Sequence, residues 1–119
     1  MQVAATSSKS GKLDLAQLDK IAPENDGDSV RAMVKTALDG NFIKARETMY
    51  ELMGKRGVSG REIIRTANRE VMRMSDLAAQ KQVEVIRLLG EYDFRLSQGA
   101  NEDIQLSAML AQFSLLGSK

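Results

Sequence analysis

Apolar residues recur at helical spacing along most of the chain, and short polar or glycine-containing segments separate the periodic stretches. A first stretch follows the i, i+3, i+4, i+7, i+8 pattern of a helix with one buried face: Val30, Met33, Val34, Ala37 and Leu38. Gly40 is suited to a left-handed helix end, and Asn41 can cap the helix that follows. The helix after Asn41 is predicted to bury a face made of Phe42, Ala45, Met49, Leu52 and Met53. Gly54 and Gly57 are predicted to end this helix.

Two further helices and a final one follow. Ser59 and Glu62 have the spacing of a capping box, which opens a helix with Ile63, Ile64, Ala67, Val71 and Met74 on its buried side. Ser75 and Asp76 interrupt the pattern. A long helix is predicted to run to about Gln98, with Val85, Leu89, Tyr92 and Leu96 as its main apolar line. Gly99 ends it, and Asn101 caps the last helix.

The beginning of the chain is less regular. Residues 1–12 hold small and polar side chains and predict a linker, so the globular domain is placed at residues 13–119. Leu15, Leu18 and Ile21 or Ala22 predict a short helix that Pro23 stops. The segment PENDGDSV predicts a turn, in which Asp26 or Asp28 caps the next helix. The fold class is therefore all-α, a single bundle of five to six helices.

Composition agrees with packed helices and narrows the chemistry. The core must be aliphatic and rich in Met, because the chain has 7 Met, no Trp, 3 Phe and 2 Tyr, with 1 Pro. No apolar run approaches the roughly 20 residues that span a bilayer, and no signal peptide is visible, so we expect a cytoplasmic protein with no membrane contact. Without His or Cys, the commonest general bases, thiolate nucleophiles and zinc ligands are excluded.

Phosphate and metal sites also fail on the residues. The segment TSSKSGKL resembles a phosphate-binding loop only superficially, because Thr6 stands where the first Gly belongs and Leu13 where Ser or Thr follows the Lys. The carboxylates form no D-x-D cluster on a loop that would favour Mg²⁺. We therefore assign no catalytic, cofactor-binding or metal-binding residue in this chain.

One charged pattern allows a nucleic-acid interpretation. An arginine stripe, formed by Arg61, Arg65, Arg69 and Arg73, recurs every four residues on one helix and could contact phosphates. However, the net charge is only +1 and no aromatic residues are interleaved for base stacking. A solvated helix face is therefore favoured, with weak DNA contact as the alternative.

The last helix is apolar on two sides. One flank carries Ile104, Ala108, Ala111 and Leu115, and the other carries Leu106, Met109, Leu110, Phe113 and Leu116. A helix that is apolar on every side can be a central helix that its own domain covers entirely. However, a small bundle seldom covers a helix on every side, so the alternative is that one flank packs inward and the other meets a second subunit. A polar stripe on the preceding helix, at Glu84, Arg87, Glu91, Arg95 and Gln98, is a water-facing surface or the margin of such a contact.

These segments resemble a known family. GNFIKAR, the SG that opens the next helix, and GEYDFRLSQGANEDIQL are similar to the C-terminal collar of replication factor C small subunits, especially the archaeal type. The resemblance covers about residues 28–117. It implies a helical collar through which subunits join, and it places Arg95, Asn101, Glu102 and Gln105 at a helix–helix corner. We expect these four residues, together with Leu106, Leu110 and Phe113, to shape a subunit interface.

The resemblance also implies what the parent protein does. Replication factor C subunits are AAA+ ATPases that open a ring-shaped sliding clamp and place it on primed DNA. Their ATP and Mg²⁺ site and their contacts with clamp and DNA lie in two other modules. The expected partners of this chain are therefore other replication factor C subunits, both further copies and the large subunit. The leading hypothesis is a non-catalytic oligomerisation domain, the alternative is a stand-alone helical nucleic-acid binder using the arginine stripe, and an enzyme comes a distant third.

Overall fold

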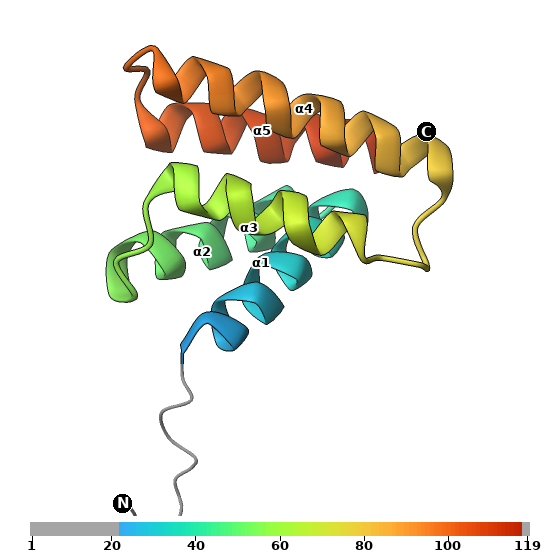
Figure 1. The fold of residues 1–119 in the computed structure, drawn as a ribbon, viewed down its shortest axis with the longest axis horizontal. Coiled ribbons are helices and arrows are strands. Elements are labelled where there is room, and N and C mark those ends of the chain that lie inside the picture. The colour runs from blue at the N-terminus through green and yellow to red at the C-terminus, as the bar shows by residue number, and fades with distance from the viewer. Residues whose placement is uncertain (1–21, 118–119) are drawn as a thin grey trace, which may run out of the picture.

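The computed structural model describes residues 22–117, with side chains from residue 26 onward. Figure 1 shows an arrangement built from helices alone within this range. The elements are α1 (Ala22–Leu38), α2 (Phe42–Tyr50), a π-helical turn η2 (Glu51–Lys55), α3 (Gly60–Met72), α4 (Ala79–Ser97) and α5 (Glu102–Gly117). The all-α class predicted from the periodicity is confirmed.

The bundle is organised around α1, which packs against α2, α3 and α5. Helices α4 and α5 run antiparallel along one side of the molecule, and α3 packs against α4 (Figure 1). Most of the residues predicted for the apolar faces form one core, whose largest fully buried members include Phe113, Met33, Met49, Leu52, Ile63 and Leu89. Burying a side chain of this size contributes about 1.5–3 kcal/mol, so this shared core holds the helices together.

Three of the predicted helix starts are confirmed by their hydrogen bonds. The Asn41 side chain accepts from the amide of Lys44 at 3.2 Å, and the Asn101 side chain accepts from the amide of Ile104 at 2.9 Å. At the start of α3 the Ser59 hydroxyl accepts from the amide of Glu62 at 3.1 Å. Each cap satisfies a backbone donor that has no partner inside its helix.

The structure corrects the prediction for the start of α1. Residues 23–28 are helical, so this segment forms no turn, and neither Asp26 nor Asp28 caps a helix. Proline is tolerated in a first helical turn because its missing N–H has no partner there anyway. The predicted linker at residues 1–12 and the short helix around Leu15 and Leu18 lie outside the described residues.

Two glycines stand at positions where a side chain would be strained or would clash. Helix α2 continues through Gly54 into the π-helical turn, and the chain leaves that turn at Gly57 with a φ of 70°, a left-handed value that favours glycine. At the end of α5, a Cβ on Gly117 would lie 1.6 Å from the backbone oxygen of Leu38. Only glycine fits there, so the ends of α1 and α5 meet directly.

Candidate functional site: two exposed apolar faces

The exposed large hydrophobic side chains of the described residues fall into two groups. One group lies on α2 and α5 and the other on α3 and α4, and their members are 40–65% exposed: Ile43, Tyr50, Ile104 and Leu115 in the first, and Met72, Val83 and Phe94 in the second. Exposed apolar clusters are typical of interaction surfaces. We call them the α2–α5 face and the α3–α4 face.

The α2–α5 face is held together by a polar network between its two helices. The Arg46 guanidinium donates to the Ser107 hydroxyl at 3.0 Å, and the Tyr50 hydroxyl donates to the Asp103 carboxylate at 3.0 Å. Residue numbers rise along α2 as they fall along α5, so the helices run antiparallel. Ile43 therefore lies beside the turn of α5 that follows Ser107.

Tyr50 is the centre of this network. The Arg46 guanidinium stacks over its ring with 4.6 Å to the ring centroid, and also donates to its hydroxyl. Partial desolvation of the phenol, followed by its hydrogen bond to Asp103, raises the pKa of Tyr50 above its ordinary value. The phenol is thus neutral at physiological pH, and the ring stays fixed at the edge of the face.

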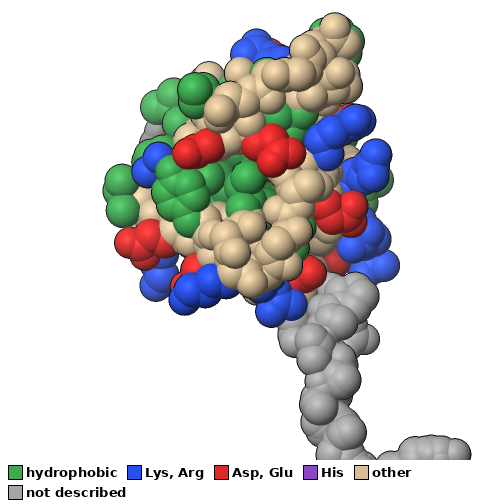
Figure 2. Space-filling model, turned by 90° about the vertical axis from the view of Figure 1, so that its left-hand side faces the viewer, with side chains coloured by type: hydrophobic (Ala, Val, Ile, Leu, Met, Phe, Trp, Pro, Cys, Tyr) green, Lys and Arg blue, Asp and Glu red, His purple; other side chains and the backbone are tan. Residues whose placement is uncertain are grey.

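Figure 2 views the end of the bundle that carries the turn between α4 and α5. Hydrophobic side chains gather on one half of this view, and Lys and Arg side chains line the opposite margin. The hydrophobic half of the view belongs to the helix pair α2 and α5, and the opposite margin with Lys and Arg belongs to α3 and α4. Glu47, one turn from both Ile43 and Tyr50, is exposed and without an ion-pair partner among the described residues, as is Arg69 on α3.

The α3–α4 face contains a groove of about 310 Å³, lined by Ile64, Arg65, Asn68, Ile86, Leu89, Gly90 and Asp93. The two helices are tied together at its ends. Arg61 pairs with Asp93 at 3.3 Å, and the Gln82 side chain donates to the backbone oxygen of Val71 at 2.9 Å. Phe94 therefore lies near one end of the groove, and Met72 and Val83 lie near the other.

Gly90 gives this groove its open middle. It lies in the interior of α4 and is exposed, and a Cβ built on it would meet nothing within 4 Å. A glycine inside a helix costs about 0.8–1.0 kcal/mol relative to alanine. Packing within the chain does not require glycine at this position.

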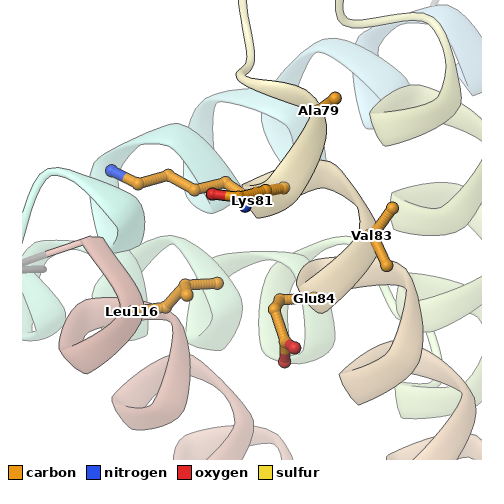
Figure 3. A pocket seen from close by; sticks show the side chains of 6 residues that line it. Ala79, Lys81, Val83, Glu84 and Leu116 are labelled. Atoms are coloured by element: carbon orange, nitrogen blue, oxygen red, sulfur yellow. The ribbon is translucent and has the colours of Figure 1, made fainter.

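A second hollow, of about 730 Å³, lies where α4 begins and α5 ends. Its lining consists of Ala79, Gln80, Lys81, Val83, Glu84 and Leu116. Figure 3 shows Val83 on α4 and Leu116 coming from α5, with the charged ends of Lys81 and Glu84 at the margin. The hollow therefore lies between α4 and α5, and Val83 is the residue that it shares with the α3–α4 face.

The predicted polar stripe of α4 is confirmed as a row of ion pairs. Arg87 lies 2.9 Å from Glu84 and 3.6 Å from Glu91, and Arg95 lies 2.6 Å from Glu91. All four side chains are substantially exposed, so each pair contributes at most a few tenths of a kcal/mol. Whether this row borders a subunit contact stays a prediction.

Most of the arginine stripe on α3 is neutralised within the chain. Arg61 pairs with Asp93, Arg65 lies 3.9 Å from Glu62, and Arg73 lies 3.8 Å from Glu70. Of the four, only Arg69 has no ion pair among the described residues. The ion pairs agree with the expectation of a solvated helix face and weaken the case for DNA binding, which stays a prediction.

The corner residues named from the sequence lie around the turn between α4 and α5. Asn101 caps α5, and Arg95 stacks near the Tyr92 ring with 5.1 Å to its centroid. The half-buried Glu102 approaches α3, since a Cβ on Gly60 would lie 3.1 Å from its side chain. The Gln105 side-chain oxygen is buried and has no hydrogen-bond partner within residues 22–117.

The structure corrects three of the proposed interface residues. Leu106, Leu110 and Phe113 are fully buried in the core of the chain itself. On the sequence alone, either flank of α5 could have been the buried one. The burial of these three residues argues against a place in a subunit contact, and the opposite flank, with Ile104 and Leu115, is the exposed one.

Sequence reasoning missed the α3–α4 face. Val83, Gly90 and Phe94 stand at spacings of 0, 7 and 11, which places them on one side of a helix. Val83 and Phe94 are 11 positions apart, so their pattern is weaker than the repeat of buried residues along α4. A helical wheel of α4 shows the alignment of these three residues when it is searched for a second, weaker apolar stripe.

The described residues contain no group of three or more acidic side chains that could hold a metal ion. In the same range no helix has both the length and the apolar character needed to cross a membrane. What the described fold does present is a small helical domain whose exposed apolar side chains lie on two faces. The class is that of a small all-α domain.

Comparison with known proteins identifies the family. Residues 27–112 match the replication factor C C-terminal domain, so the chain belongs to this family. It is 45% identical over 92 residues to a replication factor C small subunit of Pyrococcus furiosus, and 41% identical over 97 residues to one of Methanococcus vannielii. These alignments cover 77% and 82% of the chain but only 11% and 30% of the two relatives.

Proposed function

We propose that this chain is the collar of a clamp-loader small subunit. In this role it holds AAA+ subunits in the ring that loads the sliding clamp onto primed DNA during replication. Membership of the replication factor C C-terminal domain family supports the clamp-loader role. Its partners would be further copies of the subunit and the large subunit of the same loader.

The observation that carries the oligomerisation role is the pair of exposed apolar faces. A domain of this size normally leaves apolar side chains scattered singly, and gathered ones indicate a contact surface. Here Ile43, Ile104 and Phe94 are each more than 60% exposed although an extensive core was available to bury them. Association would remove these side chains from water.

The chain is proposed to be non-catalytic. Nucleotide hydrolysis, clamp opening and contact with primed DNA would belong to the other modules of the parent subunit, as the resemblance implies. In this chain the acidic side chains mostly pair with arginine, as Glu91 does with Arg95 and Asp93 with Arg61. We expect calorimetry with ATP and Mg²⁺ to give no saturable heat.

The test of the oligomerisation role is sedimentation velocity of the purified chain over a hundredfold range of concentration. We expect the sedimentation coefficient to rise with concentration as the exposed faces associate. Circular dichroism of the same samples must show that helicity is unchanged. A folded chain that sediments as a monomer at every concentration would contradict the proposal.

A further inference from the structure

The start of α1 is held differently from the rest of that helix. From Val30 onward, α1 buries apolar side chains in the shared core. Residues 25–29 are Asn, Asp, Gly, Asp and Ser, so none is apolar and all form helices less readily than Ala, Leu or Lys. In Figure 1 the blue start of α1 projects from the lower end of the bundle. Apolar packing therefore does not explain why this segment is helical.

A first arginine–carboxylate contact takes the place of apolar packing. The Arg56 guanidinium donates to the Asp26 carboxylate, and the two side chains are 37% and 29% exposed. Arg56 directly follows the π-helical turn η2, and its backbone N–H donates to the backbone oxygen of Glu51 at 3.2 Å. This bond fixes the backbone of Arg56, so its side chain is held where it reaches α1.

Arg31 makes the second contact. Its guanidinium donates to the Asp28 carboxylate, one turn earlier in α1, at 2.8 Å. The same guanidinium is anchored on α3, because it also donates to the buried Glu70 at 2.7 Å. The backbone of Gly27 lies close to the other oxygen of Glu70, since a Cβ on Gly27 would be 3.0 Å from it. Glycine thus permits this close approach while it weakens the helix that it belongs to.

We infer that residues 22–29 form a charge-held latch. This segment leaves the bundle as a unit when the contacts of Asp26 with Arg56 and of Asp28 with Arg31 break, while the helix from Val30 onward stays in the core. Ion pairs between partly exposed side chains are weak and are weakened further by salt. Opening the latch therefore costs much less free energy than unfolding the bundle, whose core is apolar.

Release of the latch lengthens the chain that enters the bundle. Its eight residues span about 12 Å as a helix and about 26 Å when extended, so opening adds about 14 Å. Residues 1–21 join the bundle through this segment, so a pull on them acts on the latch before it reaches the core. Resting on the proposed function, this slack lets a module joined through residues 1–21 move without loosening the collar.

The experiment is amide hydrogen exchange of the whole chain, followed by mass spectrometry at low protein concentration. The amides of residues 26–29 report on the latch, because the first four amides of a helix have no partner inside it. The amides of residues 34–38 report on the core end of the same helix. In the wild type we expect the latch amides to exchange at least about tenfold faster than the core amides. Raising NaCl from about 0.05 M to about 1 M should widen this difference.

Two variants remove the anchor of Asp26. Arg56 is far in sequence from the reporting amides, so its replacement leaves their intrinsic exchange rates unchanged. In Arg56→Met we expect the latch amides to exchange about two- to fivefold faster, and the amides of residues 34–38 to keep the wild-type rate. Arg56→Glu places a second carboxylate beside Asp26 and should accelerate the latch amides further.

The matched control is Arg87→Met. Arg87 pairs with Glu84 and Glu91 on the surface of α4, so its loss removes ion pairs of the same kind away from α1. Both sets of reporting amides should exchange at the wild-type rate in this variant.

Two outcomes would overturn the inference. A common exchange rate for residues 26–29 and 34–38 in the wild type would mean that α1 opens as a whole. Unchanged latch rates in both Arg56 variants would mean that Arg56 does not hold the segment. Exchange is read on the single chain, so neither outcome depends on self-association. A chain that never associates would instead contradict the proposed function and leave the latch in place.

Discussion

A guanidinium nitrogen of Arg31 on α1 lies 2.7 Å from a carboxylate oxygen of Glu70 on α3. Glu70 is 6% exposed, so its charge is held almost out of water between the two helices. Arg73 makes a second, longer contact of 3.8 Å, and the backbone of Gly27 passes close to the other carboxylate oxygen. Arg31 is thus the main partner of a buried acid.

Replacing Arg31 with Met should destabilise the chain by about 1–3 kcal/mol, the cost of leaving a buried polar group without its partner. Urea unfolding followed by circular dichroism measures this loss. The double variant Arg31→Met with Glu70→Met removes the buried charge as well. It should be more stable than the single variant, because replacing both partners of a pair costs less than removing one. Equal stabilities of the two variants would contradict the view of Glu70 as a buried charge that depends on Arg31.

The helical glycines offer a matched pair of substitutions. Gly90→Ala has open space and should stabilise the monomer by about 0.5–1 kcal/mol through helix propensity. Gly27→Ala gains the same propensity, but its Cβ would lie 3.0 Å from the Glu70 carboxylate. We expect Gly27→Ala to bring no gain or a loss in urea unfolding measured at low protein concentration. A stabilisation as large as that of Gly90→Ala would show that the contact is easily relieved.

The ion pair between Lys35 and Asp76, at 2.7 Å, predicts a pH dependence. The hydrogen bond from Lys35 is the main cause that lowers the pKa of Asp76 below its ordinary value of 3.8. A lowered pKa in the folded state stabilises the protein above the unfolded-state pKa, and this contribution is lost as the pH falls through the folded-state pKa.

In Lys35→Met this contribution should therefore be missing at neutral pH. The difference in unfolding free energy between wild type and variant should shrink as the pH is lowered through about 4. Lys44→Met is the matched control, because Lys44 is exposed and has no ion pair among the described residues. The unfolding free energy of Lys44→Met should depend on pH in the same way as that of the wild type. A constant difference for Lys35→Met would exclude the pair as its cause.

Periodicity predicted most of the fold because buried faces and caps are local features. Met33, Met49 and Ile63 lie in the core as their spacing indicated, and Asn41 and Asn101 cap the helices that they precede. The start of α1 could not be read in this way. A proline and four acidic or amide residues predict a turn locally, but the contact of Gly27 with Glu70 depends on packing against α3.

The candidate site was less predictable for a physical reason. A helix with two apolar flanks has no local signal that says which flank meets the core. On α5 that choice is made by α1, which packs against the side carrying Leu110 and Phe113. The α3–α4 face is formed by two separate helices, which the pairing of Arg61 with Asp93 helps to join, so its groove depends on tertiary structure.

One matched pair of variants can show which flank of α5 belongs to the core and which is exposed. Leu110→Glu places a charge at a fully buried position, and such an unpaired charge costs several kcal/mol. We expect this variant to lose most of its helical circular dichroism at 25 °C. Ile104→Glu introduces the same charge on the same helix at a position that is 64% exposed, in the first turn where a negative charge is favourable. Its unfolding free energy, measured in urea, should lie within about 0.5 kcal/mol of the wild-type value. If Leu110→Glu stayed folded and only lost self-association, Leu110 would be an interface residue after all, and the flank of α5 that carries it would not belong to the core.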